Sequence, residues 1–364
     1  MSEWKKVKLG DILQIKKGDY ITKKDAREGI YPVILGGKEP AYYIDKYNHT
    51  GKAIVVSRSG ASAGFVSFWN EPIFVTDGFL IEPKEKITHE FLYYALKSKQ
   101  ALLHNAQKGA AIPHVTPFLI SDIDFLLPNN DSQHRIATIL SRYDSLIENY
   151  QKQIKLFEEA AQRLYKEWFV DLHFPGHETT KIVDGVPEGW ENKTLDEYCS
   201  VFTGKKNANA AIQSGKYKFF TCGDAPLQID SFIYDGPAII ISGNGSYAGR
   251  TTFYEGKFDL YQRTYACTIN NNENRDLIYG LYEIVKCELT AQISGGTHGA
   301  AIPYIVMGDV TKFTFTSNDI VLRKFSNIIK NFLDRIICIS SQIRLLTEAR
   351  DRLLPKLMSG EIAV

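Results

Sequence analysis

The sequence predicts an α+β protein made of two copies of one unit, each a β-rich domain followed by a long helix. Three observations predict this fold. Four motifs occur twice in the same order, the front of each copy is rich in β-branched and aromatic residues, and each copy ends in a long stretch with a regular apolar seam. At 364 residues the chain is also longer than one hydrophobic core usually serves, so we expect two cores.

The repeat consists of four motifs whose second copy follows the first after 185 to 190 residues. Coincidental glycine-rich turns would explain the second and third motifs but not the last, so we interpret the chain as a tandem duplication. The paired motifs are Trp4 and Leu9 with Trp190 and Leu195, "SRSGASAG" (57–64) with "SGNGSYAG" (242–249), "GAAIP" (109–113) with "GAAIP" (299–303), and "QIKLFEEAAQRL" (153–164) with "QIRLLTEARDRL" (342–353).

The two predicted domains, 1–130 and 190–320, have the same order of elements. Strands are predicted in "GKAIVVSR" and "FVSFW" of the first copy and in "PAIIIS" and "TYACTIN" of the second. A helix follows in each copy, "THEFLYYALKSKQALLHN" with Thr88 as its N-cap and "NRDLIYGLYEIVKCELTAQ". "GAAIP" then lies on the loop after this helix, and "SDIDFLLP" or "GDVTKFTFT" returns as the final strand.

Two long helices are predicted at 131–170 and 321–358. The first has Asp131 or Ser132 as its cap and contains no Gly or Pro. We expect the second to stop or kink near Pro355, because proline cannot donate the helical hydrogen bond. The remaining segments are an aperiodic linker with Pro and Gly (171–189) and a C-terminal tail (359–364).

Apolar residues in both helices alternate in steps of four and three, which is the seam of a heptad repeat rather than the broader stripe of a globular helix. A helix with one narrow seam needs one partner, so we expect the two helices to form a coiled coil. The duplication favours an antiparallel, pseudo-twofold symmetric pair. The seam residues are Ile136, Leu140, Tyr143, Ile147, Tyr150, Ile154, Phe157 and Leu164, and Phe325, Ile329, Phe332, Ile336, Ile339, Ile343, Leu346 and Leu353, with Arg350 as the one polar residue in register.

Hydrophobic content of 44% and charged content of 23% are those of an ordinary folded soluble protein. The formal net charge is +1, so any surface that binds nucleic acid must be a local patch. The five cysteines are odd in number and form no C-x-x-C pair, which favours reduced thiols. The first residues contain no apolar signal region, and no stretch of about 18 apolar residues occurs, so we expect a cytoplasmic protein without a membrane segment.

The sequence offers no constellation for catalysis, a cofactor or a metal. A DNA amino-methyltransferase would have an N/D/S-P-P-aromatic motif, and no Pro-Pro dipeptide occurs. "GNGSYAG" has Arg58 in place of its first glycine in the other copy, so we interpret it as a turn. His173 and His177 are separated by Pro175 and have no further ligands nearby in sequence. We therefore expect a non-catalytic protein without catalytic residues, cofactor or metal.

Three further motifs are "PEGW" (187–190), "QHRIA" (133–137) and "RLLPKLMSGEI" (352–362). With the duplication and the paired helices, they give a chain that resembles, over essentially its full length, the specificity subunit of type I restriction-modification enzymes. The resemblance implies two target recognition domains, each binding one half of a split double-stranded DNA sequence, with the helices as a spacer. It also implies two modification subunits that dock on the helices and hold S-adenosylmethionine, and restriction subunits that join through them.

Residues that read DNA sequence should lie where the copies differ. "GAAIP" is common to both copies and cannot distinguish two half-sites, so it is framework or at most a contact to backbone phosphate. Arg and Lys suit guanine, Asn suits adenine, and any Lys can bind phosphate instead. The candidate DNA-binding residues are Lys16, Lys17, Lys38, Arg58, Ser59 and His114 in the first domain, and Lys205, Lys206, Asn207, Asn244, Tyr247, Arg250 and His298 in the second.

Two alternatives stay open at the level of sequence. The same scaffold serves related systems whose methylase and nuclease are fused in one partner. A coiled-coil adaptor that joins two ligands without binding DNA would also explain the helices, although not "PEGW" or "RLLPKLMSGEI".

Overall fold

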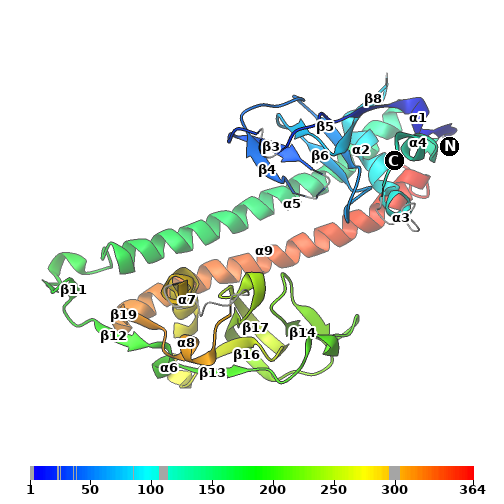
Figure 1. The fold of residues 1–364 in the computed structure, drawn as a ribbon. Helices are drawn as coiled ribbons and strands as arrows, with labels where there is room; N and C mark the ends of the chain where they lie inside the picture. Colours follow the sequence, from blue (N-terminus) through cyan, green and yellow to red (C-terminus); the bar gives the residue numbers. More distant parts are fainter. Residues whose placement is uncertain are drawn as a thin grey trace. The chain divides into compact units, whose positions relative to one another are not determined.

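The computed structural model in Figure 1 describes residues 4–22, 24, 26–35, 37, 39–84, 86–105, 114–294 and 304–364. Both copies of "GAAIP" lie outside the described residues. Contacts between residues divide the chain into two compact units, Met1–Tyr150 with Gln342–Val364 (unit 1) and Gln151–Ser341 (unit 2). The sequence prediction treated the long helices as segments separate from the two domains. In the structure, each compact unit combines one β-rich domain with part of each long helix.

Unit 1 contains a four-stranded antiparallel sheet, β2-β8-β5-β6, a three-stranded sheet, β4-β3-β7, and the pair β1-β9. Its elements are β1 (Lys5–Lys8), α1 (Leu9–Ile12), β2 (Leu13–Lys17), β3 (Tyr31–Ile34), β4 (Tyr42–Ile44), β5 (Ala53–Ser57), β6 (Val66–Trp69), β7 (Phe74–Val75), β8 (Gly78–Pro83), α2 (His89–Ser98), α3 (Gln100–Asn105), α4 (Pro117–Ser121), β9 (Asp124–Leu127), and parts of α5 (Asn130–Tyr165) and α9 (Asp319–Ser359).

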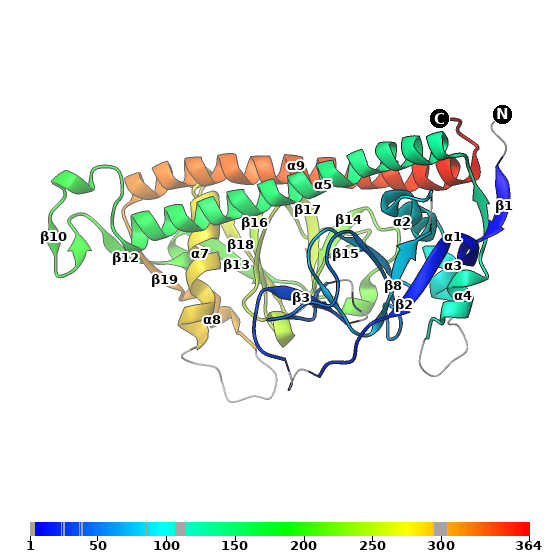
Figure 2. The same cartoon turned by 90° about the horizontal axis from the view of Figure 1, so that it is seen from above.

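The main core of unit 1 lies between its four-stranded sheet and the long helices, with α2 in the middle (Figure 2). Phe91 of α2, Ile54 of β5, Leu140 of α5 and Leu357 of α9 belong to this one cluster. Thr88 caps α2 as predicted, because its side chain accepts a hydrogen bond from the Phe91 N–H. The first and last parts of the chain are therefore held in one core. Helix α5 begins in this core, and helix α9 ends in it.

Unit 2 contains a six-stranded sheet, β13-β18-β16-β17-β14-β15, and the pairs β12-β19 and β10-β11. Its elements are a π-helical turn (Lys166–Val170), β10 (Ile182–Val183), β11 (Val186–Pro187), β12 (Glu191–Thr194), α6 (Leu195–Tyr198), β13 (Cys199–Thr203), β14 (Tyr217–Phe220), β15 (Leu227–Ile229), β16 (Tyr234–Ser242), β17 (Thr251–Leu260), β18 (Thr264–Ile269), α7 (Leu277–Ser294), α8 (Met307–Thr311), β19 (Thr314–Ser317), the other parts of α5 and α9, and 3₁₀ turns at His177–Thr179, Ala208–Ala210, Gly245–Tyr247 and Asn272–Asn274.

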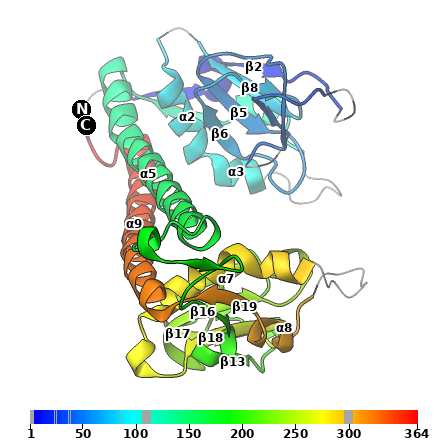
Figure 3. The same ribbon diagram turned by 90° about the vertical axis from the view of Figure 1, so that its left-hand side faces the viewer.

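The sheet of unit 2 is buried on both faces. Ile239 and Ile241 of β16 belong to the cluster with α7 and α9, whereas Ile240 belongs to a second cluster with Phe220 and Phe258. Alternate residues of a strand point to opposite faces, so a buried strand reads as a continuous apolar run. Figure 3 shows α7 lying along the sheet.

The two long helices run antiparallel, as predicted. In unit 1 the Arg350 guanidinium forms an ion pair with Asp144. In unit 2 the rings of Phe157 and Phe332 are 5.8 Å apart, and Trp168 lies 5.8 Å from Phe325. Partner numbers along α9 fall as numbers along α5 rise, which confirms the duplicated α+β fold with an antiparallel coiled coil. All sixteen predicted seam residues are buried or half-buried.

The helix ends differ in detail from the prediction. The cap of α5 is Asn129, whose side-chain oxygen accepts from the Ser132 N–H at 2.9 Å, and neither Asp131 nor Ser132 supplies it. Pro355 does not end α9, which continues to Ser359. The buried Leu354 and Leu357 beside it hold this last turn in the core of unit 1, and that packing outweighs the lost hydrogen bond.

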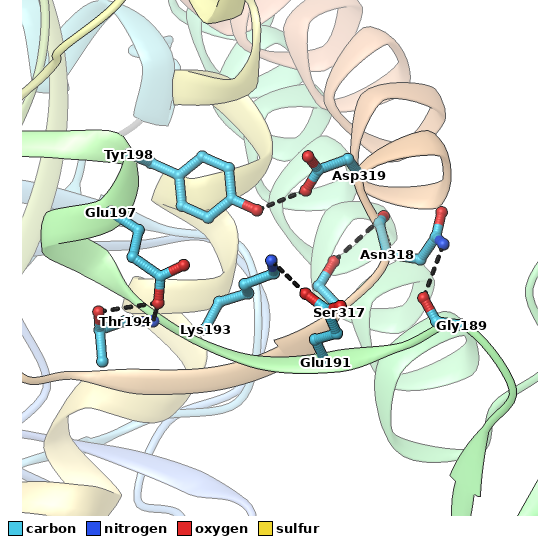
Figure 4. Close-up of polar contacts among 9 residues, drawn as sticks. All are labelled: Gly189, Glu191, Lys193, Thr194, Glu197, Tyr198, Ser317, Asn318 and Asp319. Atoms are coloured by element: carbon cyan, nitrogen blue, oxygen red, sulfur yellow. Dashed lines mark hydrogen bonds and ion pairs between the residues drawn. The ribbon is translucent and has the colours of Figure 1, made fainter.

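The "PEGW" segment fastens the start of the second domain to the start of α9 (Figure 4). Gly189 has φ +82°, and its carbonyl accepts from the Asn318 side chain at 2.9 Å. Trp190 is buried against Phe174, with ring centroids 4.9 Å apart. The Tyr198 hydroxyl donates to Asp319 at the N-terminus of α9. The predicted linker is therefore ordered around this junction, and it includes the short β10-β11 hairpin.

Among the described residues, the structure has no helix that is long and apolar enough to cross a membrane.

Replacement of Phe325 by alanine tests the packing of the coil in unit 2. Phe325 is 0 % exposed and contacts Trp168 and Phe169, so Phe325→Ala should lower the free energy of unfolding by about 3–5 kcal/mol. Denaturant unfolding of the purified chain measures this loss. The control is Ile320→Ala on the same helix, where the side chain is 68 % exposed and a change below about 0.5 kcal/mol is expected. Equal stability of the two variants would contradict the described packing.

Candidate nucleic-acid interface

In unit 1, strand β5 leads into a glycine loop, residues 58–65, that closes on the end of the strand. The Gly64 N–H donates to the Ser57 carbonyl at 2.8 Å. Gly60 and Gly64 have φ of +79° and +83°, in the left-handed region that favours glycine. A Cβ on Gly64 would lie 2.9 Å from the backbone of Leu103, so the loop is pressed against α3.

Unit 2 has the same loop after β16, at residues 243–250. The Gly249 N–H donates to the Ser242 carbonyl at 2.8 Å, and Gly245 and Gly249 have φ of +79° and +86°. The repeated S-x-x-G-x-x-x-G spacing therefore specifies one backbone conformation, which the chain builds twice.

Three segments meet at the loop of unit 1. The Arg58 N–H donates to the Asp77 carbonyl at 3.3 Å, and the Arg58 carbonyl accepts from the Val115 N–H at 2.9 Å. Ser59 and His114 form an antiparallel bridge, and His114 is the first described residue after "GAAIP". We call this group loop junction 1, which comprises residues 57–65, 76–78 and 114–115.

The same three segments meet in unit 2. The Gly243 N–H donates to the Arg263 carbonyl at 2.9 Å, and the Gly243 carbonyl accepts from the Ile305 N–H at 2.9 Å. Asn244 and Tyr304 form the antiparallel bridge, directly after the second "GAAIP". This group, loop junction 2, comprises residues 242–250, 261–264 and 304–305. The two junctions share a backbone hydrogen-bond pattern but differ in their side chains.

Loop junction 1 contains three of the predicted DNA-binding residues. The Ser59 hydroxyl donates to the carboxylate of Asp77, and the Arg58 guanidinium lies 3.7 Å from the same carboxylate. His114 is exposed beside them. The remaining candidates of this unit are Lys16 and Lys17, which are exposed on the edge strand β2, and Lys38, which lies outside the described residues.

Arg250 of loop junction 2 is held by its neighbours. Its guanidinium donates to the Asp224 carboxylate at 3.0 Å and to the Asp224 carbonyl at 2.7 Å, and it lies 4.5 Å from the centroid of the Tyr247 ring. Half-buried Asn244 lies in the same loop. A planar guanidinium with several fixed partners holds the loop in place.

Lys206, one of the candidate DNA contacts, is engaged by a buried carboxylate. Its ammonium lies 2.7 Å from the carboxylate of Asp259, which is 4 % exposed, and it also donates to Ser231. Removal of either partner of a buried ion pair is costly, so this geometry gives Lys206 a structural role. The other candidates of unit 2 are the exposed Lys205 and Asn207, and His298, which lies outside the described residues.

A family model described as "Type I restriction modification DNA specificity domain" matches residues 1–158 and 187–330 of the chain, one stretch for each copy of the repeat. The chain belongs to this family. The match confirms the resemblance predicted from "PEGW", "QHRIA" and "RLLPKLMSGEI", and members of the family serve as non-catalytic specificity subunits.

The relatives of this specificity protein agree with the match. The MjaIX specificity subunit of Methanocaldococcus jannaschii is 27 % identical over 343 residues, which cover 86 % of this chain and 78 % of the relative. The EcoDI specificity subunit of Escherichia coli is 37 % identical over 126 residues, which cover 35 % and 27 %. A crystal structure of the type I S subunit from M. genitalium has the same fold, with a TM-score of 0.66, 20 % identity, and coverage of 98 % and 96 %.

Burial keeps two thiols of this specificity protein from ionising. Burial raises the pKa of Cys199 to about 12 and that of Cys267 well above its ordinary value, so both thiols stay protonated near neutral pH. The described residues also contain no group of three or more His, Cys, Asp or Glu side chains that could hold a metal ion.

One residue of loop junction 2 was not predicted from the sequence. Arg263 stands where loop junction 1 has Asp77, and its backbone carbonyl has the same role. The offset of 186 residues between the two agrees with the repeat, but no matching letters mark it, because the residues differ in charge.

Replacement of the junction glycines tests the loop geometry. Gly60→Ala meets no atom within 4 Å and should cost only about 1–2 kcal/mol for its left-handed backbone. Gly64→Ala has the same strain and also meets the backbone of Leu103, so it should cost about 1–3 kcal/mol more. Thermal unfolding of both variants measures the difference. If Gly64→Ala melts at the temperature of Gly60→Ala, the close contact with α3 is wrong.

Proposed function

We propose that this protein is the DNA-recognition subunit of a type I restriction-modification complex, in which each unit binds one half of a bipartite double-stranded target. The observation that supports this most strongly is the duplicated loop junction. One backbone arrangement occurs in both units, while the side chains on it differ. A scaffold that reads two different half-sites needs this combination of constant support and variable side chains.

The charges at the two junctions support reading of different sequences. In junction 1 the carboxylate of Asp77 accepts a hydrogen bond from Ser59 and forms an ion pair with Arg58, with His114 beside them. Junction 2 lacks that ion pair, because Gly243 replaces the arginine. The candidates Asn244 and Tyr247 follow it in the loop. Donors and acceptors at equivalent places differ, so the same approach to DNA would select different bases.

The helices carry the rest of the proposed function. The antiparallel coil would set the distance between the half-sites and dock two modification subunits, which would supply S-adenosylmethionine and methyl transfer, and through them restriction subunits. Exposed apolar side chains on the helices support such docking: Leu156 of α5 is 63 % exposed and Leu345 of α9 is 55 % exposed. Family membership and the duplicated loop junctions with different side chains together favour this function over an adaptor that does not bind DNA.

Exchange of residues 190–320 for the equivalent domain of a relative tests whether each unit reads only its own half-site. Each junction is built entirely within one unit, so the exchange should change one half of the methylated sequence and leave the other half as it was. Sequencing of methylated adenines in cells that contain the modification partner gives the result. The matched control is exchange of residues 1–130, which should change the other half only. If both halves change in either chimera, the units are not independent readers.

Shortening of both helices tests the spacer. Deletion of 147–153 together with 336–342 removes one heptad from each helix and keeps both seams in phase. The coil would shorten by about 10 Å, which is about three base pairs. Three base pairs also turn B-form DNA by about 100°, so we expect a shorter spacer between the half-sites or a large loss of methylation. Full activity on the original spacer would show that the helices do not set this distance.

A further inference from the structure

Asp77 of unit 1 and Arg263 of unit 2 occupy the same place in the fold. Each precedes the strand that pairs with the end of β5 or β16, with Ser57 opposite Gly78 and Ser242 opposite Thr264. In each unit the backbone carbonyl of this residue also accepts a hydrogen bond from the N–H of the first residue of the glycine loop. The duplication has therefore placed an anion and a cation at equivalent positions of the two loop junctions.

The surroundings of the two side chains differ. In unit 1 the carboxylate of Asp77 is engaged by Arg58 and Ser59. In unit 2 the residue equivalent to Arg58 is Gly243, and a Cβ there would lie 2.3 Å from the Arg263 carbonyl oxygen. No side chain can therefore stand at that position to pair with Arg263.

Two other cations of this region are paired with carboxylates. Arg250 holds the Asp224 carboxylate, and Lys206 holds that of Asp259. Within the described residues the guanidinium of Arg263 makes no hydrogen bond or ion pair, and the side chain is exposed. Of the two arginines in loop junction 2, Arg250 and Arg263, Arg263 is therefore the one whose guanidinium has no partner among the described residues.

The backbone that carries this side chain is well fixed. The Arg263 carbonyl accepts from the Gly243 N–H at 2.9 Å and from the Cys222 thiol at 3.1 Å. Two residues further on, the Tyr265 hydroxyl donates to the Ile305 carbonyl at 3.1 Å, which ties the start of β18 to the segment after "GAAIP". A charged side chain on a rigid turn has little backbone freedom to lose on binding.

We propose that Arg263 is a specificity-determining residue of unit 2 and that it reads a guanine in the major groove of that unit's half-site. The inference rests on the proposed DNA-binding function. The guanidinium presents parallel N–H donors whose spacing fits the O6 and N7 acceptors of guanine, and no acceptor among the described residues is bonded to them. Asp77 has no donor at the equivalent place, so unit 1 reads its half-site by a different rule.

The test uses the complex of the full chain with its modification partner and duplexes in which each base pair of the target is changed in turn. In wild type, one G·C pair of the half-site of unit 2 should be required. Arg263→Ala should reduce discrimination at that one pair by about 5- to 150-fold, with the other positions unchanged. Arg263→Gln should shift the preference at the same pair from guanine to adenine, because glutamine pairs with adenine N6 and N7.

Arg275→Ala is the matched control, because Arg275 is an exposed arginine of the same unit that lies 3.8 Å from Glu255 instead of at the junction. It should leave every position unchanged. If Arg263→Ala weakens binding equally on all duplexes and lowers the salt dependence by about one ion, Arg263 contacts phosphate and the proposal is wrong. If the wild-type complex shows no preference for any sequence, the proposed function fails as well. Thermal unfolding of each variant excludes misfolding as the cause.

Discussion

The structure depends on the burial of one short helix in each unit between a sheet and the paired long helices. In unit 1 this helix is α2, and in unit 2 it is α7. Neither a sheet with an exposed apolar face nor a long helix with a narrow seam is stable in water alone, and the short helix covers both. Phe91 and Leu281, both 0 % exposed, mark the centres of the two cores. This constraint places the loop junction of each unit on a rigid support, because the loop begins at the end of the buried central strand.

The two units satisfy the constraint with different polar groups. In unit 1 the hydroxyl of Tyr94 donates to Asp144 at 2.6 Å, and Arg350 pairs with the same carboxylate. Arg350 is therefore the polar seam residue because it has an acidic partner on α5. The equivalent of Tyr94 in α7 is Glu283, which is 1 % exposed. Burial raises the pKa of the Glu283 carboxyl, and only Lys286 faces it as a counter-charge within 4 Å among the described residues. The two interfaces between short and long helices are therefore not interchangeable, although the backbone plan is.

The loop junctions show how a duplicated protein can keep a framework and change its recognition. The constant parts are glycines with left-handed backbone and main-chain hydrogen bonds, which are independent of side-chain identity. The variable parts are side chains that project from this framework. Asp77 in loop junction 1 is paired with Arg58, whereas Arg263 in loop junction 2 has Gly243 at the place of Arg58 and no ion-pair partner among the described residues. Divergence at such positions alters the bases that are read without disturbing the fold that presents them.

The sequence by itself determined the duplication, the β-rich domains and the two long helices, because each leaves a local and periodic pattern. The direction of the helix pair leaves no such pattern, and the sequence favoured an antiparallel pair only through the symmetry of the duplication. The seam from Ile136 to Leu164 could be read from its spacing, and the loop glycines from their repetition. Only the tertiary structure decided which charged side chains form ion pairs with one another. Arg250 meets Asp224 across 26 residues and Lys206 meets Asp259 across 53, and neither pairing has a sequence pattern. The equivalence of Arg263 with Asp77 became visible only through backbone hydrogen bonds, because the availability of a charge depends on which carboxylate the fold brings beside it.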